Sequence, residues 1–366
     1  MHAQAKKQMD VPFVLITVML LIIGLIALLS ASYPKGYYNP RQGPFFYFNR
    51  QFVFTIVGLV AMWVVSCFDY KYYRRWAIYL YAISVVLLIL VLTPLGTSSH
   101  NAQRWLFGFQ PSEVAKFAII MLFSVMASTR PESVRSIRGL AAYVGLISVL
   151  IGLLYLEPHM SASMILIVVG FSILVVAGMD IRFLGPLIVA GIILSTVAYF
   201  TMNHVHERID MFLNPFLDAR GDGWQAVQSH IAIGSGGLFG LGLGQSRQKF
   251  LYLPEPMNDF IFSVVCEELG FIGTVLILIL FAYFVYRAFS IARRAPDRFS
   301  CLVATGIATH FAFQILLNLA VISGLFPVTG ASLPLFSYGG TALVMQLVEI
   351  GILLNISRNI KSSQRD

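Results

Sequence analysis

The stretch VPFVLITVMLLIIGLIALLSA, residues 11–31, decides the fold class of this chain. About twenty consecutive apolar residues are enough for an α-helix to cross the hydrocarbon core of a bilayer. Comparable apolar runs recur from Val11 to Ile356, and 58% of the 366 residues are hydrophobic whereas only 11% are charged. This composition is far from that of a soluble domain, and it predicts an all-α polytopic membrane protein.

The first apolar run is also open to a second interpretation. Lys6 and Lys7 precede it, and small residues follow at 30–32, as they do in a secretory signal peptide with its cleavage site. The run is long enough to span the bilayer, however, whereas the apolar core of a signal peptide is shorter. We therefore favour an uncleaved first helix.

Ten membrane spans are predicted, within one membrane domain that covers residues 1–366. The spans lie at about 11–31, 50–68, 73–93, 112–129, 138–156, 160–178, 184–203, 258–286, 300–323 and 335–357. With the N-terminus inside, sixteen lysines and arginines fall in the inner segments and eight in the outer ones. Because basic residues accumulate on the cytoplasmic side of membrane proteins, this bias predicts that both termini are cytoplasmic.

Charge, cysteine usage and motifs exclude several other functions. The net charge of +8 comes mostly from short connecting segments, where it sets topology, so we expect no binding of nucleic acid. The three cysteines lack CxxC spacing and lie in or beside apolar runs, which favours packing over a disulfide or metal role. The sequence also lacks HExxH spacing, a serine nucleophile elbow and a Rossmann fingerprint.

The outer connection between the seventh and eighth spans, residues 204–257, is far longer than the others. A long structured loop in a compact protein is usually functional. Its middle, IAIGSGGLFGLGLGQS at 231–246, is apolar, so we expect it to fold back onto the membrane. The glycines there form only a weak phosphate-loop motif, and they favour close backbone packing or approach to a bulky head group.

Charged side chains near the ends of spans are candidate site residues, because charge inside the bilayer is costly without a partner or polar cavity. Glu113 and Lys116 are three residues apart and can pair on one helix face. The pair is either a structural ion pair or part of a polar cavity in which Lys116 attracts an anion. Arg104, on the same outer side, either binds substrate or extends from the interface as a snorkelling cation.

Other ionisable residues favour structural roles. Glu157 and His159 flank Pro158 in a tight outer connection, where a lone histidine is more often hydrogen-bonded structure than a catalyst. We expect Glu349, in the last span, to bond a neighbouring helix. Glu267 and Glu268 are expected to be protonated or packed within the protein, as internal support.

Asp259 is the strongest catalytic candidate. It follows a proline-bracketed turn and lies near the start of an apolar helix, in LPEPMNDFIF at 253–262. The helix N-terminus favours the carboxylate, whereas burial in a low dielectric disfavours it. A modest net effect of burial would suit a general base near neutral pH. The structural alternative is that Asp259 caps the helix together with Asn258.

The residues alone leave two classes of function open. One is a membrane enzyme that works on a lipid-linked substrate at the outer face, and the other is a transporter of an amphipathic anion. A transporter should show polar groups that continue to the inner face and an internal repeat, which is not visible here. The enzyme is favoured by charged residues that gather on the outer side, namely Arg104, Lys116, Arg208, Arg220, Arg247, Lys249 and Asp259.

At these residues the chain resembles the SEDS family (shape, elongation, division and sporulation), whose members FtsW, RodA and SpoVE polymerise peptidoglycan. The resemblance covers about Val11 to Arg358. Its motifs are NAQRW at 101–105, QPSE at 110–113 with Lys116, QAVQS at 225–229, GLG at 242–244, LPE at 253–255, DFIF at 259–262, EELG at 267–270, Asn318, GLFPVTG at 324–330 and LPLFSYGG at 333–340.

The resemblance implies a ten-helix glycosyltransferase of the bacterial cytoplasmic (inner) membrane that uses lipid II, with Asp259 as its essential aspartate. It also implies a class B penicillin-binding protein as transpeptidase partner and no nucleotide-sugar or organic cofactor. Contact with membrane lipid is expected, and a divalent cation stays open as an additional requirement. A lipid II flippase is the alternative function.

The chain departs from the family pattern at two places. Where many members have His-Thr or His-Ser before the aspartate, this chain has Met257-Asn258. The common Pro-Asp-Leu/Phe-Gly is replaced by PHMS at 158–161, which leaves no acid there. The sequences NDFIF at 258–262 and EPH at 157–159 resemble the FtsW and SpoVE branch more than RodA.

Charge, position and motif together give the predicted site. The catalytic residue is Asp259. The predicted substrate-binding residues are Arg104, Glu113, Lys116, Arg208, Arg247, Lys249, Glu255 and Ser337. The predicted supporting residues are Glu157, Glu267, Glu268 and Pro327.

Overall fold

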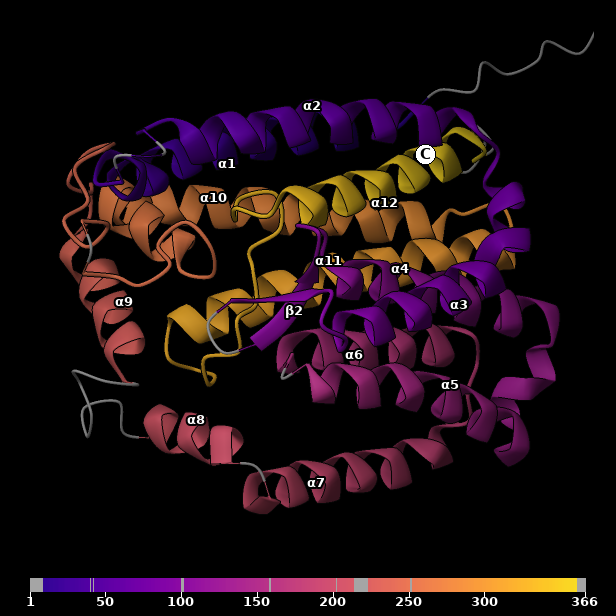
Figure 1. Ribbon diagram of the computed structural model, residues 1–366. Helices are drawn as coiled ribbons and strands as arrows, with labels where there is room; N and C mark the ends of the chain where they lie inside the picture. Colours follow the sequence, from indigo (N-terminus) through magenta and orange to yellow (C-terminus); the bar gives the residue numbers. More distant parts are fainter. Residues whose placement is uncertain are drawn as a thin grey trace, which may run out of the picture.

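The computed structural model describes residues 9–39, 41, 43–99, 102–157, 159–201, 203–213, 223–250 and 252–360, and it is mostly helical (Figure 1). Of the residues singled out above, five lie outside the described ranges, namely Lys6, Lys7, Asn101, Pro158 and Arg220.

A helix lies over each of the ten predicted spans. These helices are α1 Val11–Tyr37, α2 Phe46–Cys67, α3 Tyr73–Val91, α4 Pro111–Thr129, α5 Ile137–Leu156, α6 Met160–Val176, α7 Leu184–Thr201, α10 Ile261–Arg293, α11 Arg298–Ile322 and α12 Gly340–Arg358. Short 3₁₀ turns, η1 Tyr70–Tyr72, η2 Pro131–Arg135 and η3 Ile181–Phe183, precede α3, α5 and α7.

Within the described ranges, eight helices are long and apolar enough to cross a membrane. They are α1 to α5 and α10 to α12, with η1 counted as the start of the third. Helix α6 has 17 residues and is shorter than the others. The chain is therefore a multi-pass membrane protein, and the crossing of the bilayer by α6 and α7 stays a prediction.

Helix α4 lies at the centre of the bundle, in contact with α3, α6, α11 and α12. It is buried almost throughout, with Ala115 and Ala118 fully enclosed. Small residues of this kind let neighbouring helices approach closely. By contrast, α2 and α3 leave Trp63 and Trp76 about two-thirds exposed, at 64% and 66%. The charged residues of α4 therefore face protein, whereas the outer helices present apolar side chains suited to lipid.

Aromatic side chains join the helices around this centre. The ring centroids of Phe13 and Phe284 are 5.1 Å apart, and Phe284 meets Phe311 edge-on at 5.2 Å, which links α1, α10 and α11. Phe123 on α4 packs edge-on against Tyr143 on α5 at 5.0 Å. All three spacings are typical of favourable aromatic pairs.

The connections contain elements that the apolar pattern does not predict. Strands β1 Gly96–Ser99 and β2 Ala102–Leu106 form an antiparallel hairpin between α3 and α4. Helix α9 Trp224–Ser235 lies within the long connection 204–257, and α8 Asn203–Leu213 begins one residue before it (Figure 1). This connection is therefore structured on both sides of the undescribed residues 214–222.

The glycine-rich segment of the long connection packs against a break in α10. Gly270 has φ 66° inside that helix, and the backbone N–H of Phe271 donates to the carbonyl of Gly237 at 2.8 Å. The backbone N–H of Leu241 donates to the carbonyl of Glu267 at 3.0 Å. A Cβ atom on Gly240 would lie 2.1 Å from the Glu268 carbonyl oxygen. The prediction of close backbone packing is thereby confirmed for Gly240, and for Gly236, where a Cβ atom would lie 2.2 Å from the Cys266 carbonyl oxygen.

The two ends of the described chain lie together. The backbone N–H of Asp10 donates to Ser357 Oγ at 3.2 Å, and Arg287 pairs with the Asp10 carboxylate at 2.6 Å. This end of the bundle is opposite the end that carries α9 (Figure 1). That the termini face the cytoplasm stays a prediction.

Candidate active site

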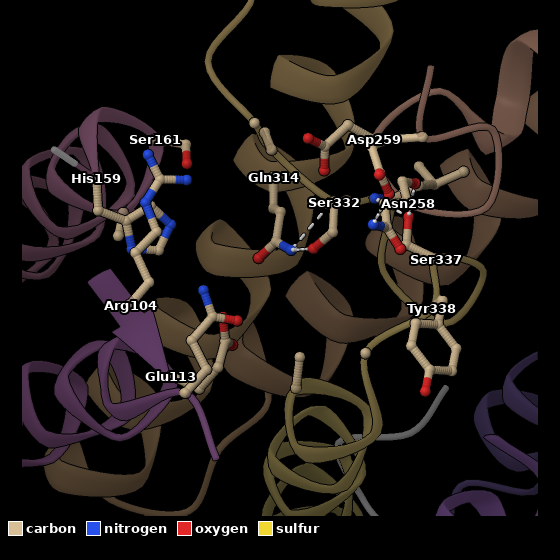
Figure 2. A pocket seen from close by; sticks show the side chains of 18 of the residues that line it. Arg104, Glu113, His159, Ser161, Asn258, Asp259, Gln314, Ser332, Ser337 and Tyr338 are labelled. Carbon is tan, nitrogen blue, oxygen red and sulfur yellow. Dashed lines mark hydrogen bonds between the residues drawn. The ribbon is translucent and has the colours of Figure 1, made fainter. Parts of the chain in front are cut away.

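A cavity of about 470 Å³ opens at the end of the bundle away from the termini. It lies where β2, the start of α4, the connection between α5 and α6, helix α8, the turn before α10 and the segment 328–339 meet. Seven predicted site residues line it: Arg104, Glu113, Lys116, Arg208, Glu255, Asp259 and Ser337. Figure 2 shows Arg104 and His159 on one side of this cavity and Asp259 on another.

Asp259 lies in the turn before α10, not in the helix. The N-cap position belongs to Phe260, so the interpretation of Asp259 as the helix cap is wrong. The Asp259 side chain is half-buried, and its carboxylate projects into the cavity (Figure 2). The helix N-terminus remains close enough to favour its charge.

Asp259 and Arg104 flank one point of the cavity, which Gly330 leaves open. A Cβ atom placed on Gly330 would lie 3.5 Å from Asp259 Oδ2 and 3.6 Å from Arg104 Nη1. The φ of Gly330 is 78°, in the left-handed region that favours glycine. The glycine therefore lets the carboxylate and the guanidinium approach the same small volume.

The backbone of the turn that contains Asp259 is fixed by residues of the late sequence motifs. Asn318 Nδ2 donates to the Asp259 carbonyl at 2.7 Å, and Ser337 Oγ donates to the Asn258 carbonyl at 2.7 Å. The backbone N–H of Tyr338 donates to the Met257 carbonyl at 2.8 Å. The position of Ser337 thus indicates that it holds the turn. Asn318 belongs to the quoted motifs, but sequence reasoning gave it no site role.

Glu255 closes the same turn from the other side. Its φ is 49°, and its carboxylate accepts from Asn258 Nδ2 at 2.5 Å. It also pairs with Lys35 at 3.2 Å. Glu255 therefore shapes the cavity wall and offsets the charge of Lys35.

Glu113 and Lys116 form an ion pair of 2.8 Å in the cavity wall. Their side chains are only 6% and 4% exposed. Lys116 Nζ also donates to Gln314 Oε1 at 3.2 Å. The pair is therefore a buried ion pair that also lines a polar cavity, and the attraction of an anion by Lys116 stays a prediction.

A chain of buried polar groups continues from Gln314 into the bundle. His310 Nε2 lies 2.9 Å from Gln314 Oε1, and His310 Nδ1 lies 2.8 Å from Glu349 Oε2. Gln314 Nε2 donates to the carbonyl of Ser332 at 3.0 Å (Figure 2), which fixes Oε1 as the acceptor for both Lys116 and His310. The predicted bond between Glu349 and a neighbouring helix is confirmed, whereas His310 and Gln314 were missed.

Two arginines supply positive charge opposite Asp259. Burial lowers the pKa of Arg104 and Arg208, and the charge of Asp259 acts in the opposite direction on both. Arginine nevertheless stays protonated in proteins. Arg104 Nε also donates to the Glu157 carbonyl at 3.4 Å, which ties it to the wall of the cavity.

The connection between α5 and α6 adds two buried groups beside Arg104. Burial raises the pKa of Glu157 to about 8, and Arg104 offsets part of that rise. Burial and the cations Arg104, Lys116 and Arg208 lower the pKa of His159 well below its usual value. Glu157 and His159 are therefore both neutral near pH 7, and the positive charge of the arginines is not cancelled from this side.

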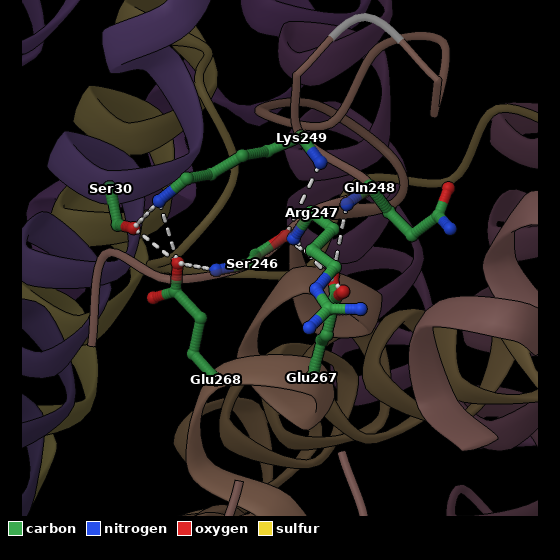
Figure 3. A network of polar contacts seen from close by, with 7 residues as sticks. All are labelled: Ser30, Ser246, Arg247, Gln248, Lys249, Glu267 and Glu268. Atoms are coloured by element: carbon green, nitrogen blue, oxygen red, sulfur yellow. Dashed lines mark hydrogen bonds and ion pairs between the residues drawn. The ribbon is translucent and has the colours of Figure 1, made fainter. Parts of the chain in front are cut away.

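Two residues predicted to bind substrate, Arg247 and Lys249, are not among those that line the cavity. Lys249 is 3% exposed, and its Nζ lies 2.8 Å from Glu268 Oε1 and 2.8 Å from Ser30 Oγ (Figure 3). Its charge is thus used inside the protein, so the assignment of Lys249 to substrate is corrected to a structural one.

Glu267 and Glu268 occupy the supporting position that the sequence predicts. Glu267 accepts from Ser246 Oγ at 2.5 Å and from the backbone N–H of Arg247 at 3.0 Å (Figure 3). Both carboxylates therefore hold residues 246–249 against α10. Pro327 directly precedes Val328, a lining residue, and does not itself line the cavity. The residues that the structure describes contain no cluster of three metal-ligating side chains, so no metal site stands out.

The chain is similar to known proteins over nearly its full length. The family with the description "Cell cycle protein", FtsW/RodA/SpoVE, matches residues 11–362. A probable peptidoglycan glycosyltransferase FtsW of Trichlorobacter lovleyi is 41% identical, over 96% of this chain and 94% of the relative. Stage V sporulation protein E of Bacillus subtilis is 39% identical, over 96% of this chain and 98% of the relative.

Two solved structures share the fold. One, described as "Structural coordination of polymerization and crosslinking by a peptidoglycan synthase complex", has a TM-score of 0.80 at 28% identity and covers 97% of this chain and 99% of that one. The rod shape determining protein RodA of Thermus thermophilus has a TM-score of 0.69 at 26% identity, with 97% and 98% covered.

Proposed function

The chain belongs to the FtsW, RodA and SpoVE family of cell cycle proteins, and on that premise we propose how it works as a peptidoglycan glycosyltransferase: Asp259 is the general base of glycan polymerisation. The observation that carries this proposal is the placement of its carboxylate in a cavity opposite two half-buried arginines. The names of the relatives favour the enzyme over a transporter.

The proposed substrate is lipid II, a disaccharide peptide on a polyprenyl diphosphate. Asp259 takes the proton from a sugar hydroxyl of the incoming lipid II, and the oxygen attacks the anomeric carbon of the growing glycan chain. A new C–O bond forms there as the bond to the diphosphate oxygen breaks. Polyprenyl diphosphate leaves with the electron pair, and the proton stays on Asp259 until it passes to solvent.

Positive charge near the leaving group supports the second half of this step. Arg104 and Arg208 line the cavity, and their guanidinium groups suit the oxygens of a diphosphate. Lys116 is already paired with Glu113, so we assign it a smaller share of the leaving-group charge. Charge that is fixed in place before the reaction stabilises the transition state without reorganisation.

The size of the cavity suits part of the substrate. Its volume of about 470 Å³ is that of a small-molecule pocket. We therefore place the sugar and diphosphate inside the cavity and the polyprenyl chain in the bilayer, at the outer face of the bacterial cytoplasmic membrane.

Polymerisation of labelled lipid II by the purified protein with its partner tests the assignment of Asp259. We expect Asp259→Asn to fold and to bind its partner, but to lose glycan synthesis. Glu132→Gln, a change at an exposed residue of η2, is the matched control and should polymerise normally. An Asp259→Asn protein that polymerises at the normal rate would remove Asp259 as the base.

A transpeptidase partner of the class B penicillin-binding protein type is also proposed. The support is the similarity to the solved peptidoglycan synthase complex, in which polymerisation and crosslinking are coordinated. Affinity purification of the tagged chain from its own membranes should recover such a protein.

A lipid II flippase is the alternative function. If the Asp259→Asn protein moved lipid II across liposome membranes and no polymer formed, the flippase would replace the enzyme.

A further inference from the structure

His159 is a buried cavity residue with unused hydrogen-bonding capacity. It occupies the N-cap position of α6, and its backbone is tied down because its N–H donates to the Leu154 carbonyl at 3.0 Å. The residue is only 5% exposed, it lines the cavity, and its Nδ1 has no hydrogen-bond partner in the part of the chain that the structure describes. Buried polar atoms without a partner are rare, because leaving them unpaired costs stability.

The groups that face His159 are mostly cationic. Three cations come from β2, α4 and α8. Of the acids nearby, Glu157 is neutral and Glu113 is paired with Lys116, whereas Asp259 lies on another side of the cavity. Arg104, Lys116 and Arg208 all act on the ring in the same direction as burial, against protonation. A neutral imidazole in this position avoids repulsion from its three neighbours.

We propose that His159 binds the diphosphate of the polyprenyl leaving group, and that it takes up a proton when the diphosphate binds. This rests on the proposed function. A diphosphate brings negative charge into the space beside the ring, which reverses the electrostatic effect of the three cations. The imidazole then donates a charge-assisted hydrogen bond to a phosphate oxygen, and this bond provides the partner that the ring lacks in the protein alone.

The position of His159 distinguishes this role from two others. A purely structural histidine would have both ring nitrogens satisfied by the protein, as His310 has through Glu349 and Gln314. A general base for the acceptor hydroxyl belongs near Asp259, whereas His159 stands on the side of the cavity with Arg104 (Figure 2). The diphosphate is the ligand that the three surrounding cations select.

The test is calorimetric binding of inorganic pyrophosphate to the purified full-length protein in detergent. Titrations at pH 7 in two buffers with different ionisation enthalpies give both the affinity and the number of protons exchanged. We expect His159→Gln to bind pyrophosphate about 10- to 100-fold more weakly, the value of one hydrogen bond between charged groups, and to take up fewer protons than the unchanged protein. His206→Gln, at an exposed histidine of α8, is the control and should change neither quantity.

Equal affinity and equal proton exchange in the His159→Gln and unchanged proteins would overturn the proposal, as would an equal loss in His206→Gln. His159→Asn serves as a second variant if His159→Gln does not fold. The same titration on Asp259→Asn separates the two proposals, because this variant should retain the His159-dependent binding even though it does not polymerise. Polymerisation by Asp259→Asn would instead contradict the assignment of the base and leave the His159 result standing.

Discussion

Asn318 on α11 donates a 2.7 Å hydrogen bond to the backbone carbonyl of Asp259. The same amide also donates to the carbonyl of Ala331 at 2.7 Å, so one side chain joins the turn that contains Asp259 to the segment that follows α11. Asn318 is fully buried, and its hydrogen bonds therefore fix the position of the Asp259 backbone, from which the carboxylate projects into the cavity.

Replacement of Asn318 by alanine should lower kcat with little change in KM. A misplacement of a reacting group by about 1 Å costs on the order of 100-fold in rate, so we expect a loss of about 10- to 100-fold in glycan synthesis. Steady-state polymerisation of labelled lipid II gives both constants.

The matched control for this prediction is Asn355→Ala. Asn355 is also buried, and it donates to the Ser66 carbonyl at the opposite end of the bundle. A fall in kcat as large in this control as in Asn318→Ala would show that the effect is one of stability rather than of positioning.

Removal of only one partner of the ion pair between Lys249 and Glu268 should destabilise the folded protein strongly. Lys249→Met leaves Glu268 buried without its cation, and breaking a buried pair in this way costs about 3–5 kcal/mol. The double variant Lys249→Met with Glu268→Gln removes both charges but keeps an acceptor for Ser30 and Ser246. It should recover much of the loss, as measured by thermal unfolding in detergent.

The folded double variant also tests the location of Lys249. Because Lys249 does not line the cavity, the KM for lipid II should be that of the unchanged protein. A several-fold rise in KM would return Lys249 to the substrate-binding residues.

Glu157 should make stability fall as pH rises. Its pKa is about 8 in the folded protein and 4.5 as its ordinary value, so between these values the folded state holds a proton that the unfolded chain has lost. The contribution of Glu157 to the free energy of unfolding is then greatest at and below about pH 4.5, and it declines as the pH rises to about 8. Thermal unfolding of Glu157→Gln across this range should show a weaker decline than the unchanged protein. The exposed Glu132→Gln should retain the full decline.

Replacement by alanine should lower the stability of the protein at Gly270 and raise it at Gly145. At Gly270, with φ 66°, a Cβ atom would lie 2.2 Å from the Gly240 nitrogen, so Gly270→Ala should cost on the order of 3 kcal/mol or more. At Gly145, inside α5, nothing lies within 4 Å of such an atom, and Gly145→Ala should stabilise the helix by about 0.5–1 kcal/mol. Thermal unfolding of both variants checks the difference in sign, and an unchanged melting temperature for Gly270→Ala would contradict the packing at the break in α10.

Much of the fold and of the candidate site is predictable from local patterns in the sequence. Apolar runs of about twenty residues located ten helices, because that signal lies within each run. The ion pair of Glu113 and Lys116 was visible for a similar reason, since residues three apart share a helix face. The position of Asp259 before an apolar helix singled it out as the catalytic candidate.

The remaining features depend on contacts between distant parts of the chain. Lys249 meets Ser30 across 219 positions, and Asn318 meets Asp259 across 59, so neither bond leaves a local pattern. Lys249 was consequently assigned to substrate when its charge is used by Glu268. The hairpin of β1 and β2 was missed because short polar strands have no apolar run.

The bond between Asp10 and Ser357 makes the chain a candidate for circular permutation. Since α1 begins beside the end of α12, a short peptide can join the two without crossing the bilayer. New chain ends in the connection between Arg294 and Asp297 would lie at the same end of the bundle. Helix α10 runs from the cavity to this end, and α11 begins there and runs back towards the cavity. The rearranged gene would therefore encode every helix in its original orientation, and the turn that contains Asp259 would stay continuous with α10.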